Sequence, residues 1–258
     1  MAEETIFEQD GPVAFLTFNR PEARNAMTWG MYEALRETAE RVDEDPGTRV
    51  LVLRGAGDKA FVGGTDIRQF LEFKTREDAL GYESRLDRSI GRLARMQKPV
   101  IAMIQGDAVG GGLFMALACD IRIAAEHTRY GVPVARTLGN FPAPANYARL
   151  VAAIGPIRAR NLLLTARLMN AEEAHVVGLV DEVVPPDQLE GRVRELAGRM
   201  AGHAPLTMSA LKEATRRLEE GSRIRDAEEL VLSCYLSQDF QEGVRAFLEK
   251  RTPNWQGR

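Results

Sequence analysis

The first half of the chain alternates between two kinds of apolar segment, and this order constrains the fold more than any other feature. Short apolar runs typical of buried strands occupy residues 13–18, 49–55, 99–106 and 120–127. Residues 28–42 and 80–96 instead place apolar side chains three to four positions apart, which predicts amphipathic helices. Strands and helices in alternation predict an α/β fold.

The second half has a different pattern. Beyond about residue 143 few strand-like segments remain, and helical spacing predominates in the C-terminal third. Near the N-terminus, Asp10-Gly11 lies between two strand-like segments and is typical of a hairpin turn. With 258 residues, of which 45% are hydrophobic, the chain can bury one large core. We expect a core over residues 1–195 and a helical C-terminal region over 196–258.

Composition and charge argue against several classes of function. A formal net charge of -3 gives no broad basic surface for nucleic acid. No apolar segment approaches the roughly 18 residues of a membrane span, and the acidic N-terminus does not resemble a signal peptide. Cys119 and Cys234 lack metal-like spacing, and the three histidines are scattered. We therefore expect two buried reduced thiols, no metal site, no membrane contact and a cytoplasmic location.

Two glycine-rich stretches precede apolar, helix-like segments. They are FVGGTDIRQF at residues 61–70 and AVGGGLFMALACDI at residues 108–121. Glycine permits a positive φ angle and a close approach of the backbone to a ligand, and the first N–H groups of a helix lack internal partners. Neither stretch has the Lys-Ser or Lys-Thr of a phosphate-binding loop. Two such helix starts that converge would form an oxyanion hole, whereas separately each is an ordinary turn.

Six segments in order along the chain carry a resemblance to a known family. They are NRPEARNAM (19–27), AFVGGTDI (60–67), GDAVGGG (106–112), CDIRIA (119–124), NAEEAHVVGLVDEVVP (170–185) and QEGVRAFLEKRTPNW (241–255). Together they resemble the enoyl-CoA hydratase/isomerase (crotonase) family over nearly the whole chain. The resemblance implies a spiral of repeated ββα units with a helical C-terminal trimerisation region, assembled as a homotrimer or hexamer. It also implies an acyl-CoA thioester substrate, with no cofactor beyond its coenzyme A.

The resemblance also implies roles for individual residues. The family's two oxyanion donors correspond here to the backbone N–H groups of Thr65 and Gly111. Positions that contact coenzyme A in the family correspond to Ala23, Arg24, Gly63, Asp66, Ile67, Phe247 and Lys250. The last two often reach the coenzyme of a neighbouring subunit. For three of these residues another role stays open, namely loop capping by Arg24, core packing by Phe247 and simple solvation of Lys250.

The chain departs from the family where hydratases carry their two catalytic glutamates. Phe114 and Val134 stand at those positions, and neither side chain can transfer a proton. Hydration needs a base for the water and an acid for the α-carbon, each contributing roughly 10²- to 10⁴-fold in rate. We therefore expect thioester binding and polarisation to persist while ordinary hydration falls by several orders of magnitude. Phe114, Val134 and Phe141 predict an apolar substrate pocket.

Residues 134–150 offer the remaining polar candidates. Arg136 could hold a substrate carboxylate or face solvent, and Asn140 could orient a water molecule or close a turn. Thr137 and Tyr147 are further polar side chains of this segment. Reactions open to such a site are double-bond isomerisation, decarboxylation, thioester hydrolysis and slow hydration. A protein that binds acyl-CoA without turnover is the alternative from a different class.

Overall fold

A computed structural model describes residues 3–71, 74–219 and 228–258. Its larger sheet has six strands in the order β1-β2-β3-β5-β7-β10. The bounds are β1 (Thr5–Asp10), β2 (Val13–Phe18), β3 (Val50–Gly55), β5 (Val100–Ile104), β7 (Ile121–Ala125) and β10 (Glu182–Val184). Only β1 and β2 pair antiparallel among these strands, through a turn at Asp10-Gly11 in which Gly11 has φ 56°. The predicted hairpin is therefore confirmed.

A smaller sheet of four strands lies beside the larger one, in the order β4-β6-β8-β9. Its strands are β4 (Ala60–Val62), β6 (Asp107–Val109), β8 (Arg129–Gly131) and β9 (Met169–Asn170). The chain passes from β3 to β4, from β5 to β6 and from β7 to β8, so each repeat adds one strand to each sheet. This is the expected spiral of ββα units. The short strands of the smaller sheet were not predicted, because two or three residues carry no readable alternation.

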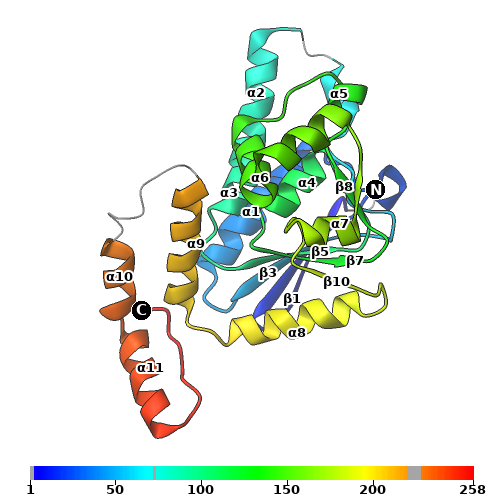
Figure 1. The fold of residues 1–258 in the computed structure, drawn as a ribbon. Helices are drawn as coiled ribbons and strands as arrows, with labels where there is room; N and C mark the ends of the chain where they lie inside the picture. The colour runs from blue at the N-terminus through cyan, green and yellow to red at the C-terminus, as the bar shows by residue number, and fades with distance from the viewer. Residues whose placement is uncertain (1–2, 72–73, 220–227) are drawn as a thin grey trace.

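Helices cover both faces of the larger sheet (Figure 1). The longer ones are α1 (Trp29–Glu44), α2 (Arg76–Leu86), α6 (Pro144–Thr165), α8 (Leu189–Ala201), α9 (Pro205–Glu219), α10 (Glu228–Tyr235) and α11 (Gln238–Glu249). The shorter ones are η1 (Pro21–Ala23), η2 (Ile67–Phe70), η3 (Asp87–Gly91), α3 (Arg92–Ala94), α4 (Gly111–Leu117), α5 (Val134–Thr137) and α7 (Ala171–Val176). No helix within the described ranges is long and apolar enough to cross a membrane.

The continuous apolar runs of the strands arise because the larger sheet separates two cores. In β2, Ala14 and Leu16 pack with α1 and its neighbours, whereas Val13 and Phe15 face the other way. On that second face Leu189 and Val193 of α8 cover the sheet. Strands that are buried on both faces read as continuous rather than alternating apolar runs. The predicted strands at residues 13–18, 49–55, 99–106 and 120–127 are confirmed as β2, β3, β5 and β7. Burial on both faces explains why their sequences are continuously apolar.

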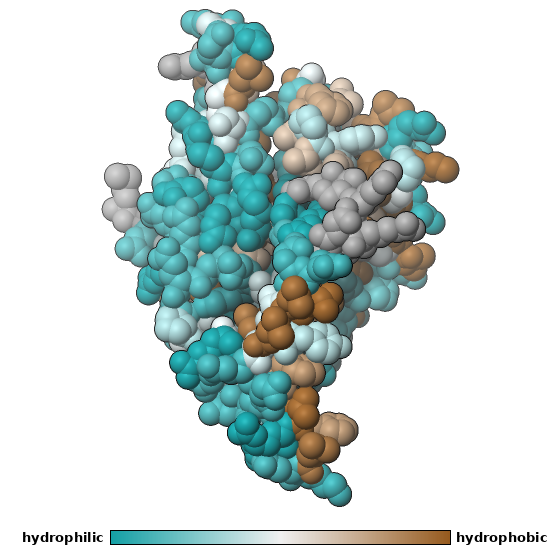
Figure 2. Space-filling view, turned by 90° about the vertical axis from the view of Figure 1, so that its left-hand side faces the viewer, coloured by the Kyte–Doolittle hydropathy of each residue, from teal (hydrophilic) through white to brown (hydrophobic). Residues whose placement is uncertain are grey.

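Of the last three helices, α9 packs beside the core through Lys212, and α10 and α11 extend outward beyond it (Figure 1). The apolar side chains of these three helices are largely exposed, and they include Leu211, Leu218, Val231, Leu232, Tyr235, Leu236, Phe240, Val244, Phe247 and Leu248. Figure 2 shows apolar atoms gathered on the lower half of this face, at the height of α10 and α11 in Figure 1. The helical C-terminal region is thus confirmed, and the division near residue 195 stays a prediction.

Candidate active site

One glycine turn, which we call the Gly111 turn, joins β6 to α4. Gly110 has φ 58°, and its N–H donates to the carbonyl of Gly131 at 2.8 Å, which ties the turn to β8. Five of the seven residues of α4 are buried. A Cβ added at Gly112 would lie 1.9 Å from the carbonyl oxygen of Val62. Glycine is therefore required here so that α4 can pack directly on the backbone of β4.

The second glycine turn, which we call the Thr65 turn, follows β4 and is bound to the segment after η1. The Gly63 N–H donates to the carbonyl of Arg24 at 2.9 Å, and the Met27 N–H donates to the carbonyl of Gly64 at 2.8 Å. Gly64 has φ 108°, which other residues rarely adopt. The helix that follows, η2, is a single 3₁₀ turn rather than the longer helix that the sequence suggested. A dipole contribution from η2 is accordingly small, and the N–H group itself is the relevant donor.

The two turns lie side by side. A Cβ built on Gly64 would be 3.7 Å from the Gly111 nitrogen, and one built on Gly111 would be 3.6 Å from Thr65 Oγ1. Within the described ranges, the N–H groups of Thr65 and Gly111 donate to no protein acceptor. Two unpaired backbone donors therefore meet at one place, although they come from segments more than forty residues apart in sequence.

Both turns line one pocket with a volume of about 240 Å³, which we call the glycine-turn pocket. Most of its walls are apolar, with Leu86, Ile90 and Val132 among them. The sequence-predicted residues that line it are Gly63, Thr65, Ile67, Gly111, Phe114, Val134, Thr137 and Asn140. The predicted apolar pair, Phe114 and Val134, thus faces the same space as the two N–H donors.

Several predicted residues lie elsewhere. In the part of the chain that the structure describes, Arg136, Phe141 and Asp66 do not line the pocket. Arg136 is exposed at the end of α5, and Phe141 is 66% exposed with its ring 5.9 Å from that of Tyr147. Arg136 on α5 and Phe141 on the loop that follows this helix are both exposed to solvent. The arrangement therefore does not support Arg136 as a holder of substrate in this pocket.

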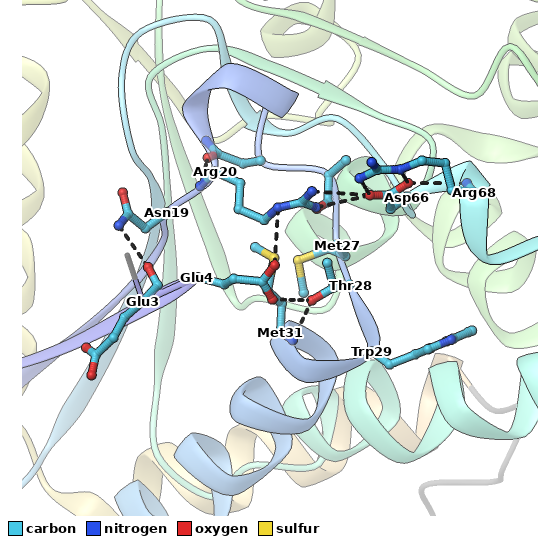
Figure 3. A network of polar contacts seen from close by, with 12 residues as sticks. Glu3, Glu4, Asn19, Arg20, Met27, Thr28, Trp29, Met31, Asp66 and Arg68 are labelled. Atoms are coloured by element: carbon cyan, nitrogen blue, oxygen red, sulfur yellow. Dashed lines mark hydrogen bonds and ion pairs between the residues drawn. The ribbon is translucent and has the colours of Figure 1, made fainter. Parts of the chain in front are cut away.

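Asp66 fixes the second turn instead of facing the pocket. Its carboxylate accepts from Arg20 Nη1 at 3.2 Å and from Arg68 Nε at 2.9 Å, as Figure 3 shows. Arg20 is itself bound to the carbonyl of Ala26 at 2.6 Å and pairs with Glu4 at 3.4 Å. The hydrogen bond from Arg68, together with that from Arg20, holds the pKa of Asp66 well below its ordinary value. The carboxylate is therefore ionised and anchors the loop that presents Thr65.

The remaining predicted coenzyme positions fall in two separate regions. Ala23 and Arg24 end the η1 turn, where Arg24 has φ 53° and an exposed side chain close to the backbone of Gly63. Phe247 is 83% exposed on α11, and Lys250 follows that helix with φ 55°. Phe247 lines a different cavity, beside Leu206 and Trp255. Within one described chain, α11 therefore does not contribute to the glycine-turn pocket.

A tyrosine pair that the sequence analysis missed supports the Thr65 turn. Thr65 Oγ1 lies 2.8 Å from the hydroxyl of Tyr32 on α1 and 3.1 Å from that of Tyr82 on α2. Burial is the main reason why the pKa of Tyr82 is raised to about 12, and burial also raises the pKa of Tyr32 well above its ordinary value. Both hydroxyls stay protonated at neutral pH and can donate hydrogen bonds.

Glu83 is the second residue that the sequence analysis missed. It lines the glycine-turn pocket, and its Oε2 atom is buried with no hydrogen-bond partner among the residues that the structure describes. Burial raises the pKa of this carboxyl above its ordinary value. A signal was present, because Glu83, Leu86 and Ile90 are spaced three and four apart on the apolar stripe of their helical segment. A carboxylate in an apolar stripe marks a candidate functional group.

Other titratable clusters are structural or absent. Asp120 pairs with Lys212 beside a cavity of about 710 Å³ between α4, α6 and α9, and it also accepts from the Val100 N–H at 2.7 Å. Cys119 is buried as predicted, whereas Cys234 is only half-buried. No group of three His, Cys, Asp or Glu side chains able to hold a metal ion occurs within residues 3–71, 74–219 and 228–258.

The fold and the site define a spiral α/β protein with paired backbone donors in an apolar pocket. A family model described as enoyl-CoA hydratase/isomerase matches residues 8–258. A crotonyl-CoA hydratase from Syntrophomonas wolfei is 35% identical over 258 residues, covering 98% of each chain. A probable mitochondrial enoyl-CoA hydratase from Dictyostelium discoideum is 36% identical over 253 residues, covering 96% of this chain and 89% of that protein.

The similarity extends to three dimensions. The solved structure of an enoyl-CoA hydratase from Bacillus anthracis matches with a TM-score of 0.90 at 32% identity, covering 99% of this chain and 100% of that one. The chain therefore belongs to the enoyl-CoA hydratase/isomerase family, and it is an enzyme of that family. The resemblance carried by the six sequence segments is confirmed, as is the crotonase-like spiral fold.

Proposed function

We propose that this enzyme binds acyl-CoA thioesters and stabilises their enolates with the backbone N–H groups of Thr65 and Gly111. The observation that carries the proposal is that these two donors are unpaired, adjacent and open to one apolar pocket. As electrons move onto the thioester oxygen, two N–H donors in a site shielded from water stabilise the developing charge. A single donor of this kind contributes about 3 to 4 kcal/mol to catalysis.

The pocket lacks glutamates at the two positions where hydratases of the family carry them. Phe114 and Val134 line it instead, and both are unable to move protons. Hydration requires an activated water and a proton donor, and an apolar wall disfavours the water itself. We propose that ordinary hydration is correspondingly slow here, although the curated relatives above are named hydratases.

Among the other reactions, the pocket favours those that pass through a thioester enolate and do not need an activated water. Arg136, the candidate for holding the carboxylate of a malonyl-type ester, lies outside the pocket, which leaves decarboxylation without that contact. Thioester hydrolysis needs an activated water, as hydration does. Double-bond isomerisation needs neither, so it is the reaction that this apolar pocket suits best. Binding without turnover remains the alternative outcome of the experiment below.

The wider assembly is part of the proposal. The exposed apolar side chains of α10 and α11 form a surface suited to contact with other copies of the chain, as in a homotrimer or hexamer. In such an assembly Phe247 and Lys250 could reach the coenzyme bound by a neighbour, while Ala23, Arg24, Gly63 and Ile67 contact it within the chain. The proposed chemistry needs no cofactor beyond the coenzyme A of the substrate and no metal. We place the enzyme in the cytoplasm.

The test compares two substitutions at Gly111. Gly111→Pro removes the N–H donor at the first helical position, where proline is tolerated. Gly111→Ala is the matched control, because it keeps the N–H while adding a Cβ that lies 3.2 Å from the Tyr32 hydroxyl. With a panel of enoyl- and malonyl-CoA esters read by mass spectrometry, we expect Gly111→Pro to lose roughly 10²- to 10³-fold in turnover. Calorimetry that detects no binding of any ester to the wild type would refute the proposal.

A further inference from the structure

Glu83 stands at the same pocket as the two donors. It lies on α2, next to Tyr82, whose hydroxyl is 3.1 Å from Thr65 Oγ1. Burial is the main cause of the raised pKa of Tyr82 and of Tyr32, the two side chains that hold the Thr65 hydroxyl, and the nearby Glu83 adds a smaller contribution to both. Glu83 on α2 therefore lines the same pocket as Thr65 and Gly111, whose N–H groups form the proposed oxyanion site.

The state of the carboxylate is unusual for a structural residue. Surface glutamates in this protein are commonly held by arginine, as Glu173 is by Arg167 and Glu242 by Arg251. Glu83 Oε2, in contrast, is buried and has no hydrogen-bond partner among residues 3–71, 74–219 and 228–258. An unpartnered buried carboxylate oxygen is costly, and such groups are retained where they have a function. The pocket gives this oxygen a possible partner in a bound substrate.

From this juxtaposition we propose that Glu83 is the catalytic residue that carries protons to and from the acyl chain of the bound thioester. The inference rests on the proposed thioester function. It assigns proton transfer to a position on α2, far in sequence from Phe114 and Val134, where hydratases carry their glutamates. A single carboxylate suits a 1,3-proton shift, because the group that takes the proton from the α-carbon can return it to the γ-carbon, whereas hydration needs a base for the water as well as an acid for the α-carbon.

The step balances without water or a co-reactant. On a β,γ-unsaturated acyl-CoA, the Glu83 carboxylate removes a proton from the α-carbon, and the electron pair moves onto the thioester oxygen. The N–H groups of Thr65 and Gly111 hold that oxygen as the dienolate. The protonated Glu83 then returns the proton to the γ-carbon, the carbonyl re-forms, and the double bond moves into conjugation. The apolar walls of Leu86, Ile90 and Phe114 suit an uncharged acyl chain and exclude competing water.

The experiment follows proton movement and binding separately. The full-length enzyme is incubated with 3-butenoyl-CoA in deuterated water, and mass spectrometry and NMR record crotonyl-CoA and deuterium at the α- and γ-carbons. Glu83→Gln keeps the shape of the side chain but cannot accept the proton, so we expect isomerisation and exchange to fall by roughly 10²- to 10⁴-fold. Calorimetric binding of 3-butenoyl-CoA should change less than threefold.

Glu77→Gln is the matched control. Glu77 is exposed on the same helix and lies outside the pocket, and its substitution removes the same charge. It should retain wild-type turnover. A thermal melt checks that Glu83→Gln is folded. If that variant is folded and forms crotonyl-CoA at the wild-type rate, or if the wild type binds the ester without forming crotonyl-CoA, the assignment of Glu83 is wrong. If the wild type does not bind the ester at all, the proposed function itself fails.

Discussion

The two glycine turns present similar donors to one pocket but are held in place by different forces. The Gly111 turn is fixed by packing, since α4 is mostly buried and Gly112 lies directly against the backbone of β4. The Thr65 turn is fixed by polar side chains, namely the Asp66–Arg20 pair and the hydroxyl bonds of Thr65 itself. A substitution that disturbs the packing at the Gly111 turn should therefore cost a large amount of stability at once. At the Thr65 turn each lost polar contact should cost a smaller, separate amount of stability or activity.

The largest effect is expected for Gly112→Ala. The new Cβ would lie 1.9 Å from the Val62 carbonyl oxygen, so α4 and β4 must move apart. We expect a loss of about 3 kcal/mol or more of unfolding free energy, at the upper end of the usual cost of overpacking. Chemical denaturation measures it. Gly111→Ala, which adds its Cβ one residue earlier without so close a contact, should retain most of the stability. Equal stability of both variants would contradict the claim that packing fixes this turn.

An intermediate effect, which depends on pH, is expected for Asp66→Asn at the polar turn. Asp66 and Arg20 have side chains only 10% and 12% exposed, so their pair is shielded from water, whereas Arg68 is 72% exposed and contributes less. We expect the loss of this charged hydrogen bond to reduce the unfolding free energy at pH 7 by about 1.5 to 3 kcal/mol.

The sign of the pH dependence follows from the lowered pKa of the Asp66 carboxyl in the folded protein. Because folding lowers the pKa of Asp66 from its ordinary 3.8, its stabilising contribution is present above that value. The contribution is lost as the pH falls from about 4 toward the lower pKa of the folded state. The gap between wild type and Asp66→Asn should therefore narrow between pH 5 and pH 2 in denaturation experiments. A gap that stays constant over this range would show that the carboxylate charge does not hold the turn.

Local pattern was sufficient to predict much of the fold. The strands of the larger sheet were predictable because burial on both faces leaves runs such as VAFLTF at residues 13–18, and α1 was predictable from its apolar stripe. The smaller sheet was not, because strands such as β9 are two residues long. η2 was overestimated because Asp66 caps a helix-like segment that stops after one 3₁₀ turn.

The candidate site was only partly predictable, for a different reason. The glycines and the apolar pair of Phe114 and Val134 are visible as motifs, so their shared pocket was expected. Thr65, Tyr32 and Tyr82 meet only in three dimensions, across separations of 33 and 17 residues. Arg136 and Asn140 are close in sequence, yet only Asn140 lines the pocket. On α5, Val134 and Thr137 face the pocket, whereas Arg136 lies on the exposed side of this short helix. A helix of one turn has too little apolar pattern to predict which side faces a pocket.

The smallest effect in this comparison is expected for the hydroxyl of Thr65, whose backbone N–H is the proposed donor. Thr65→Val keeps that N–H and the shape of the side chain but removes two hydrogen bonds, leaving Tyr32 and Tyr82 without this partner. Each such bond is worth about 1 kcal/mol, so turnover should fall by roughly tenfold or less as the turn loosens.

Thr65→Ser supplies the matched control, because it restores the hydroxyl without the methyl group and should recover most of the turnover. Steady-state kinetics on the best ester of the substrate panel compare the two variants. If Thr65→Val lost as much activity as Gly111→Pro, the side-chain bonds rather than the N–H group would dominate at this turn. The two turns would then differ in how they bind substrate, and not only in how they are held.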